Sequence, residues 1–113
     1  MKIIKKSETK TFANGSYCTA REYPLGDKGI DGAVIELSGR YPEKEFAINE
    51  KCKEMAYVIS GAGRLITTDD VTSFSADDLL LIDAGEKYYW EGRAKLFVTC
   101  TPAWFPEQHK IVP

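Results

Sequence analysis

The sequence lacks a long apolar segment and carries little net charge. None of its apolar stretches approaches the roughly 18 continuous residues that an α-helix needs to cross a bilayer, and Met1 is not followed by the apolar core of a signal peptide. The formal net charge of -2 at pH 7 gives no long-range attraction to nucleic acid or to anionic lipid. We therefore expect a cytoplasmic protein that binds neither nucleic acid nor a membrane.

Cysteine and histidine are also scarce. The three cysteines, Cys18, Cys52 and Cys100, are odd in number and widely spaced, so they match neither a complete disulfide framework nor a CxxC metal site. Reduced thiols are expected. His109 is the only histidine, and no serine or cysteine lies between the glycines of a nucleophile elbow. The sequence thus gives no support to nucleophilic catalysis.

The composition of the 113 residues is that of one globular domain. Hydrophobic residues make up 43% of the chain and charged residues 28%. A chain of this length buries enough surface to fold without a disulfide or a metal. We therefore treat residues 1–113 as a single domain.

Short apolar stretches separated by turn residues run along the chain, and none keeps a helical period for three turns. Strands at a spacing of about ten residues are typical of an antiparallel sandwich or barrel, so we predict an all-β fold. Turns are expected at Gly61-Ala62-Gly63 and at Glu91-Gly92, among other places. The eight expected strands are residues 17–23, 33–37, 46–49, 55–59, 64–67, 79–82, 88–90 and 96–101.

Two segments predict contacts beyond a simple sheet. Residues 55–59 are apolar on both faces of the expected strand, so one face can fill a barrel while the other needs a cover. Because large exposed apolar patches are uncommon on soluble monomers, we expect a homodimer. Residues 102–113 carry three prolines together with Trp104 and Phe105, which predicts an extended strap packed on the barrel rather than a strand.

Two motifs give the chain a resemblance to a known family. Glu54 is followed, across an apolar stretch, by Gly61-Ala62-Gly63, and this segment resembles the first motif of the cupin superfamily. In that family, two histidines in an HxH triplet precede the glutamate and bind a metal with it. The triplet here is Ala47-Ile48-Asn49. The second motif contains a further histidine ligand, and Tyr88 stands at the matching position.

The resemblance covers residues 32–102 and is to a small single-domain cupin with degenerate metal-binding motifs. It implies an all-β jelly-roll barrel, also called a double-stranded β-helix. Together with strand alternation, it implies a cavity lined by Asn49, Glu54, Tyr88 and Trp90. Only one of these side chains is a good metal ligand, so we expect no metal or other cofactor at this place.

Glu54 needs an explanation in such a cavity, because a buried carboxylate without a metal is costly unless it is paired or hydrogen-bonded. Its candidate partners are Tyr88, Asn49 and a cation, either Arg64 or Lys87. If burial instead raises its pKa, Glu54 can act as a general acid or base with Tyr88 opposite. The sequence leaves both explanations open.

Three hypotheses for the function follow. The first is a metal-free protein that binds a small molecule, a sugar or an organic acid, through Asn49, Glu54, Tyr88 and Trp90. The second is an enzyme of the isomerase or epimerase type that transfers protons with Glu54 and Tyr88 as catalytic residues. The third is a structural or regulatory dimer whose barrel is filled by its own side chains. His109 is a surface or packing residue unless the strap crosses the barrel mouth, where it could pair with Glu54 or bind the ligand.

Overall fold

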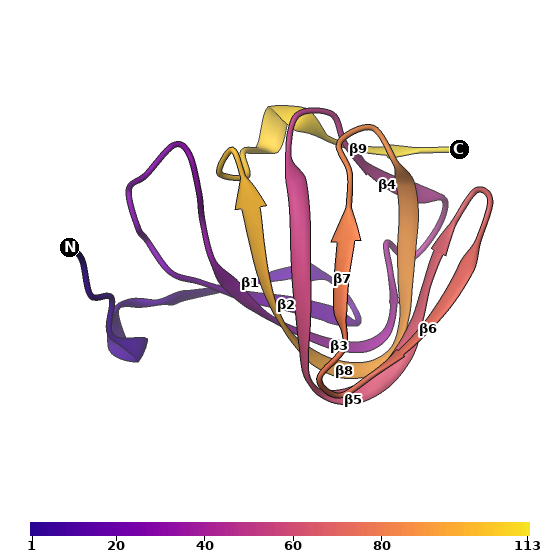
Figure 1. Ribbon diagram of the computed structural model, residues 1–113, viewed down its shortest axis with the longest axis horizontal. Coiled ribbons are helices and arrows are strands. Elements are labelled where there is room, and N and C mark those ends of the chain that lie inside the picture. The colour runs from indigo at the N-terminus through magenta and orange to yellow at the C-terminus, as the bar shows by residue number, and fades with distance from the viewer.

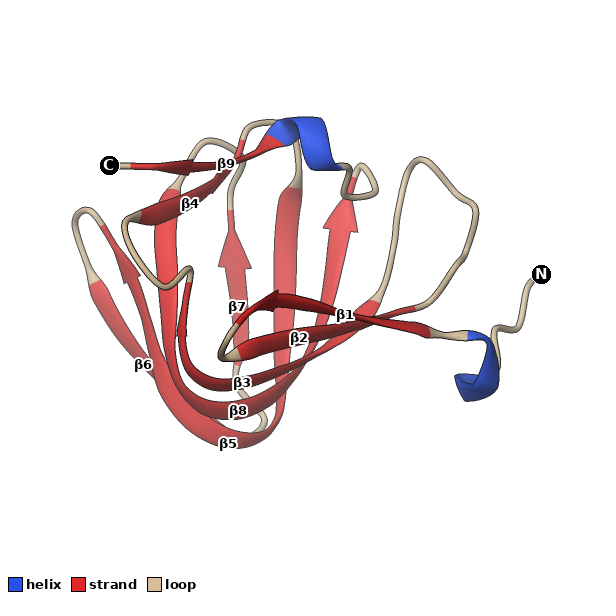
Figure 2. Cartoon of the chain, turned by 180° about the vertical axis from the view of Figure 1, so that it is seen from behind, coloured by secondary structure: helices blue, strands red, loops and turns tan.

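The computed structural model describes all 113 residues, and the chain is built almost entirely of β-strands (Figures 1 and 2). The only helical turns are two 3-10 segments of three residues each, and no helix is long and apolar enough to cross a membrane. The all-β prediction is confirmed. The elements run in the order η1 (Lys6–Glu8), β1 (Lys10–Gly15), β2 (Cys18–Glu22), β3 (Ala33–Tyr41), β4 (Phe46–Asn49), β5 (Lys53–Thr67), β6 (Val71–Ser75), β7 (Leu79–Ile82), β8 (Lys87–Thr101), η2 (Pro106–Gln108) and β9 (His109–Val112).

The sheet curls around two long strands, β5 and β8, which pair antiparallel along almost their whole length. Along its other edge β8 pairs with β3 and then with β4, while the far edge of β5 carries β7 and β6. β2 and β1 extend the sheet beyond β3, and β9 extends it beyond β4. The result is a jelly-roll barrel, with η2 and β9 lying across its upper end in Figure 1.

Glycines allow the two long strands to bend together. The sequence predicts turns at Gly61-Ala62-Gly63 and at Glu91-Gly92, and both predictions are wrong, because these residues lie inside β5 and β8. A Cβ atom on Gly63 would lie 2.4 Å from the backbone oxygen of Glu91, and one on Gly92 would lie 2.5 Å from the Cα of Gly63. The backbones approach too closely at the bend for side chains there. Four expected strands thus merge into two long ones.

Three other strands also differ from the expectation. β1 and β6 are not predicted, because nearly all their residues are exposed and show no apolar alternation. In the strap, residues 109–112 form β9, so the expectation of a strap without a strand is wrong for its second half. β9 pairs with β4 and satisfies backbone groups on an edge that would otherwise be open.

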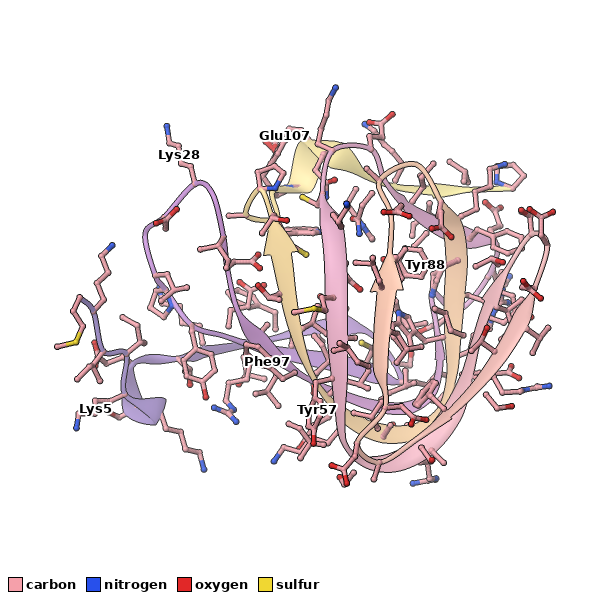
Figure 3. The ribbon with its side chains drawn as sticks, in the orientation of Figure 1. Lys5, Lys28, Tyr57, Tyr88, Phe97 and Glu107 are labelled. Carbon is pink, nitrogen blue, oxygen red and sulfur yellow. The ribbon has the colours of Figure 1, made fainter.

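Alternation along β5 separates the inside of the barrel from its outside. Val58 is fully buried, whereas its neighbours Tyr57 and Ile59 are 41% and 42% exposed. Figure 3 shows Tyr88 within the curl of the sheet and Tyr57 at its lower margin. The expected division into an inner and an outer face is confirmed.

Candidate functional site

The barrel contains a cavity on its inner side. Its volume is about 120 Å³, and 12 of the 17 residues that line it are hydrophobic. This space is large enough for several water molecules or for a small organic ligand. The polar groups on its wall come from the sheet, the loop before β3 and the strap. Apolar walls with a few converging polar groups are typical of small-molecule sites.

Glu54, on the inner face of β5, is buried and lines this cavity. Its Oε1 atom accepts long hydrogen bonds from Asn49 Nδ2 at 3.5 Å and from Cys100 Sγ at 3.6 Å. Burial raises the pKa of Glu54 to about 7, although these two hydrogen bonds oppose the increase. Near neutral pH the side chain can therefore both accept and donate a proton.

The two cations considered as partners of Glu54 lie elsewhere. Arg64 forms an ion pair with Glu91 at the surface, and Lys87 donates to the backbone oxygen of Pro113. The hypothesis that a cation holds Glu54 ionised is therefore wrong, because both side chains have partners outside the barrel. Of the candidate partners, only the Asn49 amide contacts the carboxyl group directly.

A buried pair of amides positions the polar groups of the site. Gln108 Oε1 accepts the backbone N–H groups of residues 51–52 at 3.1 and 3.2 Å. Its Nε2 therefore faces the other way and donates to Asn49 Oδ1 at 3.0 Å. Asn49 Nδ2 must then point toward Glu54 and toward Tyr88 Oη, which lies 3.4 Å away. Because a backbone N–H can only donate, the orientation of both amides is fixed.

His109 completes this network. Its Nδ1 lies 2.7 Å from Asn49 Oδ1, and an amide oxygen can only accept, so Nδ1 carries the proton. Nε2 is then free to accept from the Tyr41 hydroxyl at 2.9 Å. Burial lowers the pKa of His109, which keeps the ring neutral. The strap does cross the barrel mouth and brings His109 to the cavity wall, although the imidazole contacts Asn49 rather than Glu54.

The remaining predicted site residues take different places. Tyr88 and Trp90 line the cavity. Burial and the nearby Glu54 carboxyl raise the pKa of Tyr88 well above 10, so the phenol stays protonated. Trp90 also packs edge-on against Phe74, with ring centroids 5.5 Å apart. Asn49 does not line the cavity; it lies behind the wall, because its amide is surrounded by the groups that it positions.

Sequence reasoning missed four further residues of the site: Tyr41, Gln108, Asp31 and Trp104. Asp31 accepts the backbone N–H groups of Cys100 at 2.7 Å and of Trp104 at 2.9 Å, so it fastens the start of the strap to the barrel. The partners in these contacts lie 56 to 73 residues apart in the chain. No local sequence pattern predicts these long-range contacts, although Asp31 does lie in a glycine-rich loop.

The residues at the matching metal positions do not fit a metal. These positions hold Ala47, Asn49, Glu54 and Tyr88, which provide one carboxylate, one amide and one protonated phenol. No three histidine, cysteine, aspartate or glutamate side chains are grouped so that they could share an ion. Transition-metal sites in proteins normally use three or more imidazole, thiolate or carboxylate ligands.

No protein-family model matches the sequence, and no curated protein matches it. Solved structures do match. The Streptomyces protein Pac13, a nucleoside dehydratase, superposes with a TM-score of 0.89 at 16% identity over 99% of this chain and 91% of its own. Oxalate decarboxylase from Bacillus subtilis superposes with a TM-score of 0.79 at 16% identity, over 94% of this chain and 30% of its own. KdgF from Halomonas sp. superposes with a TM-score of 0.72 at 10% identity, over 91% of this chain and 96% of its own.

The chain has a cupin-like fold. The resemblance found in the two sequence motifs therefore extends to the three-dimensional structure. In this cupin-like barrel the motif positions lie close together, since Asn49 from β4 contacts both Glu54 from β5 and Tyr88 from β8. Identities of 10% to 16% show the fold alone, and the function must be argued from the site.

Proposed function

We propose that the protein binds a small hydroxylated molecule, of the size of a sugar or a nucleoside, in the cavity of its barrel. The observation that carries the proposal is the meeting of apolar and aromatic walls with the polar groups of Glu54, Tyr88 and Tyr41 in one cavity. Hydroxyl groups of a ligand can exchange hydrogen bonds with all three, while its apolar surface contacts the walls. A barrel filled by its own side chains would leave no such space.

The similar structures support this ligand class. Pac13 is a nucleoside dehydratase, and variants of it have been solved with uridine. Aromatic side chains at the wall here, including Trp90 and Trp104, give a flat ring surfaces on which to stack. The donor set argues for binding without a metal, because hydrogen bonds and stacking are the interactions that these residues offer.

A second candidate function is proton transfer within the bound molecule, with Glu54 as the acid or base. The carboxylate form of Glu54 would accept a proton from a carbon next to a carbonyl group. The Tyr88 hydroxyl, which stays protonated, would donate a hydrogen bond to the oxygen on which negative charge develops. Return of the proton to a neighbouring atom completes an isomerisation. The observation that favours this candidate is that Glu54 and Tyr88 line the same cavity, where burial raises the pKa of Glu54 to about 7.

The test begins with sugars and nucleosides added to chelator-treated protein, followed by thermal melting and titration calorimetry. We expect at least one of these compounds to bind, and Trp90→Ala to weaken its binding by about tenfold or more. Failure of all of them to bind at millimolar concentration would contradict the proposal.

Proton transfer is tested by following, with NMR, the exchange of ligand hydrogens with deuterated solvent. Loss of exchange is expected in Glu54→Gln and in Tyr88→Phe, and full exchange in both variants would exclude this pair.

We also propose that a second copy of the chain covers the outer face of β5, β7 and β8. In the register of the sheet, Tyr57 lies between Leu79 and Phe97, and Leu81 lies beside Met55. The apolar side chains therefore form one continuous and uncharged patch, which suits a twofold contact of the patch with itself. The patch consists of Met55, Tyr57, Ile59, Leu79, Leu81 and Phe97, each between 41% and 62% exposed.

A further inference from the structure

The wall of the cavity carries charge of one sign only. Three of its 17 residues are acidic, namely Glu22, Asp31 and Glu54, and none is lysine or arginine. The single imidazole on the wall, that of His109, is kept neutral by its burial. A ligand that enters the cavity therefore meets carboxyl groups and no compensating cation.

These three acidic groups act on the same space although they come from different parts of the chain. Glu22 ends β2, Asp31 lies in the loop before β3, and Glu54 lies on β5. Burial is the main cause that raises the pKa of Glu22 and of Glu54, and the charge of Asp31 adds to both increases. Acidic groups that line one cavity make the electrostatic potential inside it more negative, and an apolar wall screens that potential poorly.

Contacts within the protein do not neutralise these carboxyl groups. Asp31 accepts two backbone N–H groups, which carry no net charge. Glu54 receives only the long contacts from Asn49 and Cys100, both to the same oxygen. The ion pairs of the chain, Lys53 with Asp83 and Arg64 with Glu91, involve none of the three.

Aromatic rings supply the second requirement of a cation site. The walls include the indoles of Trp90 and Trp104 and the phenols of Tyr41 and Tyr88. The faces of such rings attract ammonium groups, most strongly where water is excluded. Carboxyl groups beside aromatic rings therefore match a protonated amine better than any other common ligand group.

We propose that the cavity selects a protonated amine carried on a small hydroxylated framework, and that it rejects the corresponding phosphate or carboxylate. This inference rests on the proposed function and narrows its ligand class. The ammonium group would lie among Glu22, Asp31 and Glu54 against the aromatic wall, while the hydroxyl groups bond to the other polar side chains. An organic acid, which the sequence left open as a ligand, would face Glu22, Asp31 and the carboxyl group of Glu54 with no cation on the wall to balance its charge.

Matched ligands test the inference directly. The first series is glucose, glucosamine and glucuronate, and the second is uridine, 5′-amino-5′-deoxyuridine and uridine 5′-monophosphate. In the series that binds better, calorimetry at neutral pH and low salt should show that the amine binds about tenfold more tightly than the neutral compound. The anion should bind about tenfold more weakly than the neutral member, or not at all.

Two variants test whether the acidic residues of the cavity wall cause the preference for the amine. Glu22→Gln should reduce the advantage of the amine over the neutral member, and it removes only an exposed charge at the end of a strand. Glu36→Gln is the matched control, because Glu36 is exposed on β3 and does not line the cavity. It should leave the ratio of the two affinities at its wild-type value.

The outcomes separate this inference from the function on which it rests. If the neutral member binds and the amine binds no more tightly, the charge selection is overturned and the small-molecule site stands. The same holds if Glu22→Gln and Glu36→Gln change the affinity ratio equally. If no member of either series binds at millimolar concentration, both the selection and the small-molecule site are overturned.

Discussion

The inner and outer faces of β5 are both apolar in sequence, but the fold gives them different surroundings. Val58 on the inner face is fully buried and belongs to the main core cluster, while Ile59 beside it is 42% exposed. The inner face also carries Glu54, whereas the outer face continues as an uncharged patch across β7. Hydrophobicity alone therefore does not distinguish a core, a ligand site and an interface on one strand; the neighbours of each side chain do.

The largest effect is expected from a charge placed on the inner face. Val58→Asp buries a carboxylate among apolar side chains with no partner, at a cost of more than about 4 kcal/mol, which is a large part of the total stability of a domain of this size. Ile59→Asp places the same group one residue away in contact with solvent and should change stability by about 1 kcal/mol or less. Soluble yield and thermal unfolding followed by circular dichroism give the comparison. Equal losses in the two variants would contradict the assignment of the faces.

A smaller effect is expected from Glu54 itself, through pH. Its folded-state pKa of about 7 lies above its ordinary value of 4.5, so the folded protein holds a proton that the unfolded chain releases. The stability that Glu54 contributes should therefore be fully present below about pH 4.5 and be lost as pH rises through about 7, by about 3 kcal/mol in total. The groups that face Glu54 are Asn49, Cys100, Tyr88 and, at longer range, Asp31.

Urea unfolding at about pH 5 and about pH 8 measures this loss in the wild type and in Glu54→Gln. The variant cannot release the proton, so the difference between the two proteins isolates Glu54, while His109 is present in both. Glu36→Gln, with its charge removed from the protein surface, should keep the pH dependence of the wild type. If Glu54→Gln keeps it too, the buried carboxyl is not the group that titrates.

Much of the fold could be predicted, because strand alternation and turn residues are local signals. The errors lie where a long-range contact changes the meaning of a local signal. Gly61-Ala62-Gly63 has the composition of a turn, but it forms a bend because Gly92 of β8 packs against it. β1 was missed for the opposite reason, since a wholly exposed strand has no apolar pattern to detect.

The candidate site was predictable to the extent that the motifs carry it. Glu54, Tyr88 and Trp90 line the cavity as the resemblance and the alternation imply. The position of Asn49 behind the wall depends on Gln108, whose orientation is fixed by two backbone N–H groups 56 and 57 residues away. Such contacts arise only when the strap folds over the barrel, and no spacing in the sequence encodes them.

A charge on the outer face of the sheet is expected to have the smallest effect on stability. It should, however, have a clear effect on dimer formation. Leu81→Lys adds an ammonium group at a side chain that is 57% exposed within the proposed dimer patch. A twofold contact brings this charge close to its own copy, so the dimer should weaken by more than about tenfold. The fold should lose less than about 0.5 kcal/mol in the monomer, because surface substitutions rarely cost more.

Sedimentation velocity over a range of protein concentrations measures this change. Val71→Lys is the matched control, since Val71 is also 57% exposed but lies on β6 outside the patch. A monomeric wild type at tens of micromolar, or a dimer that survives Leu81→Lys unchanged, would contradict the proposed interface. Ligand affinity measured on the same samples tests whether the inner and outer faces of the sheet act independently. It should stay unchanged in Leu81→Lys, because the cavity lies on the opposite side of the sheet and its wall includes no residue of the patch.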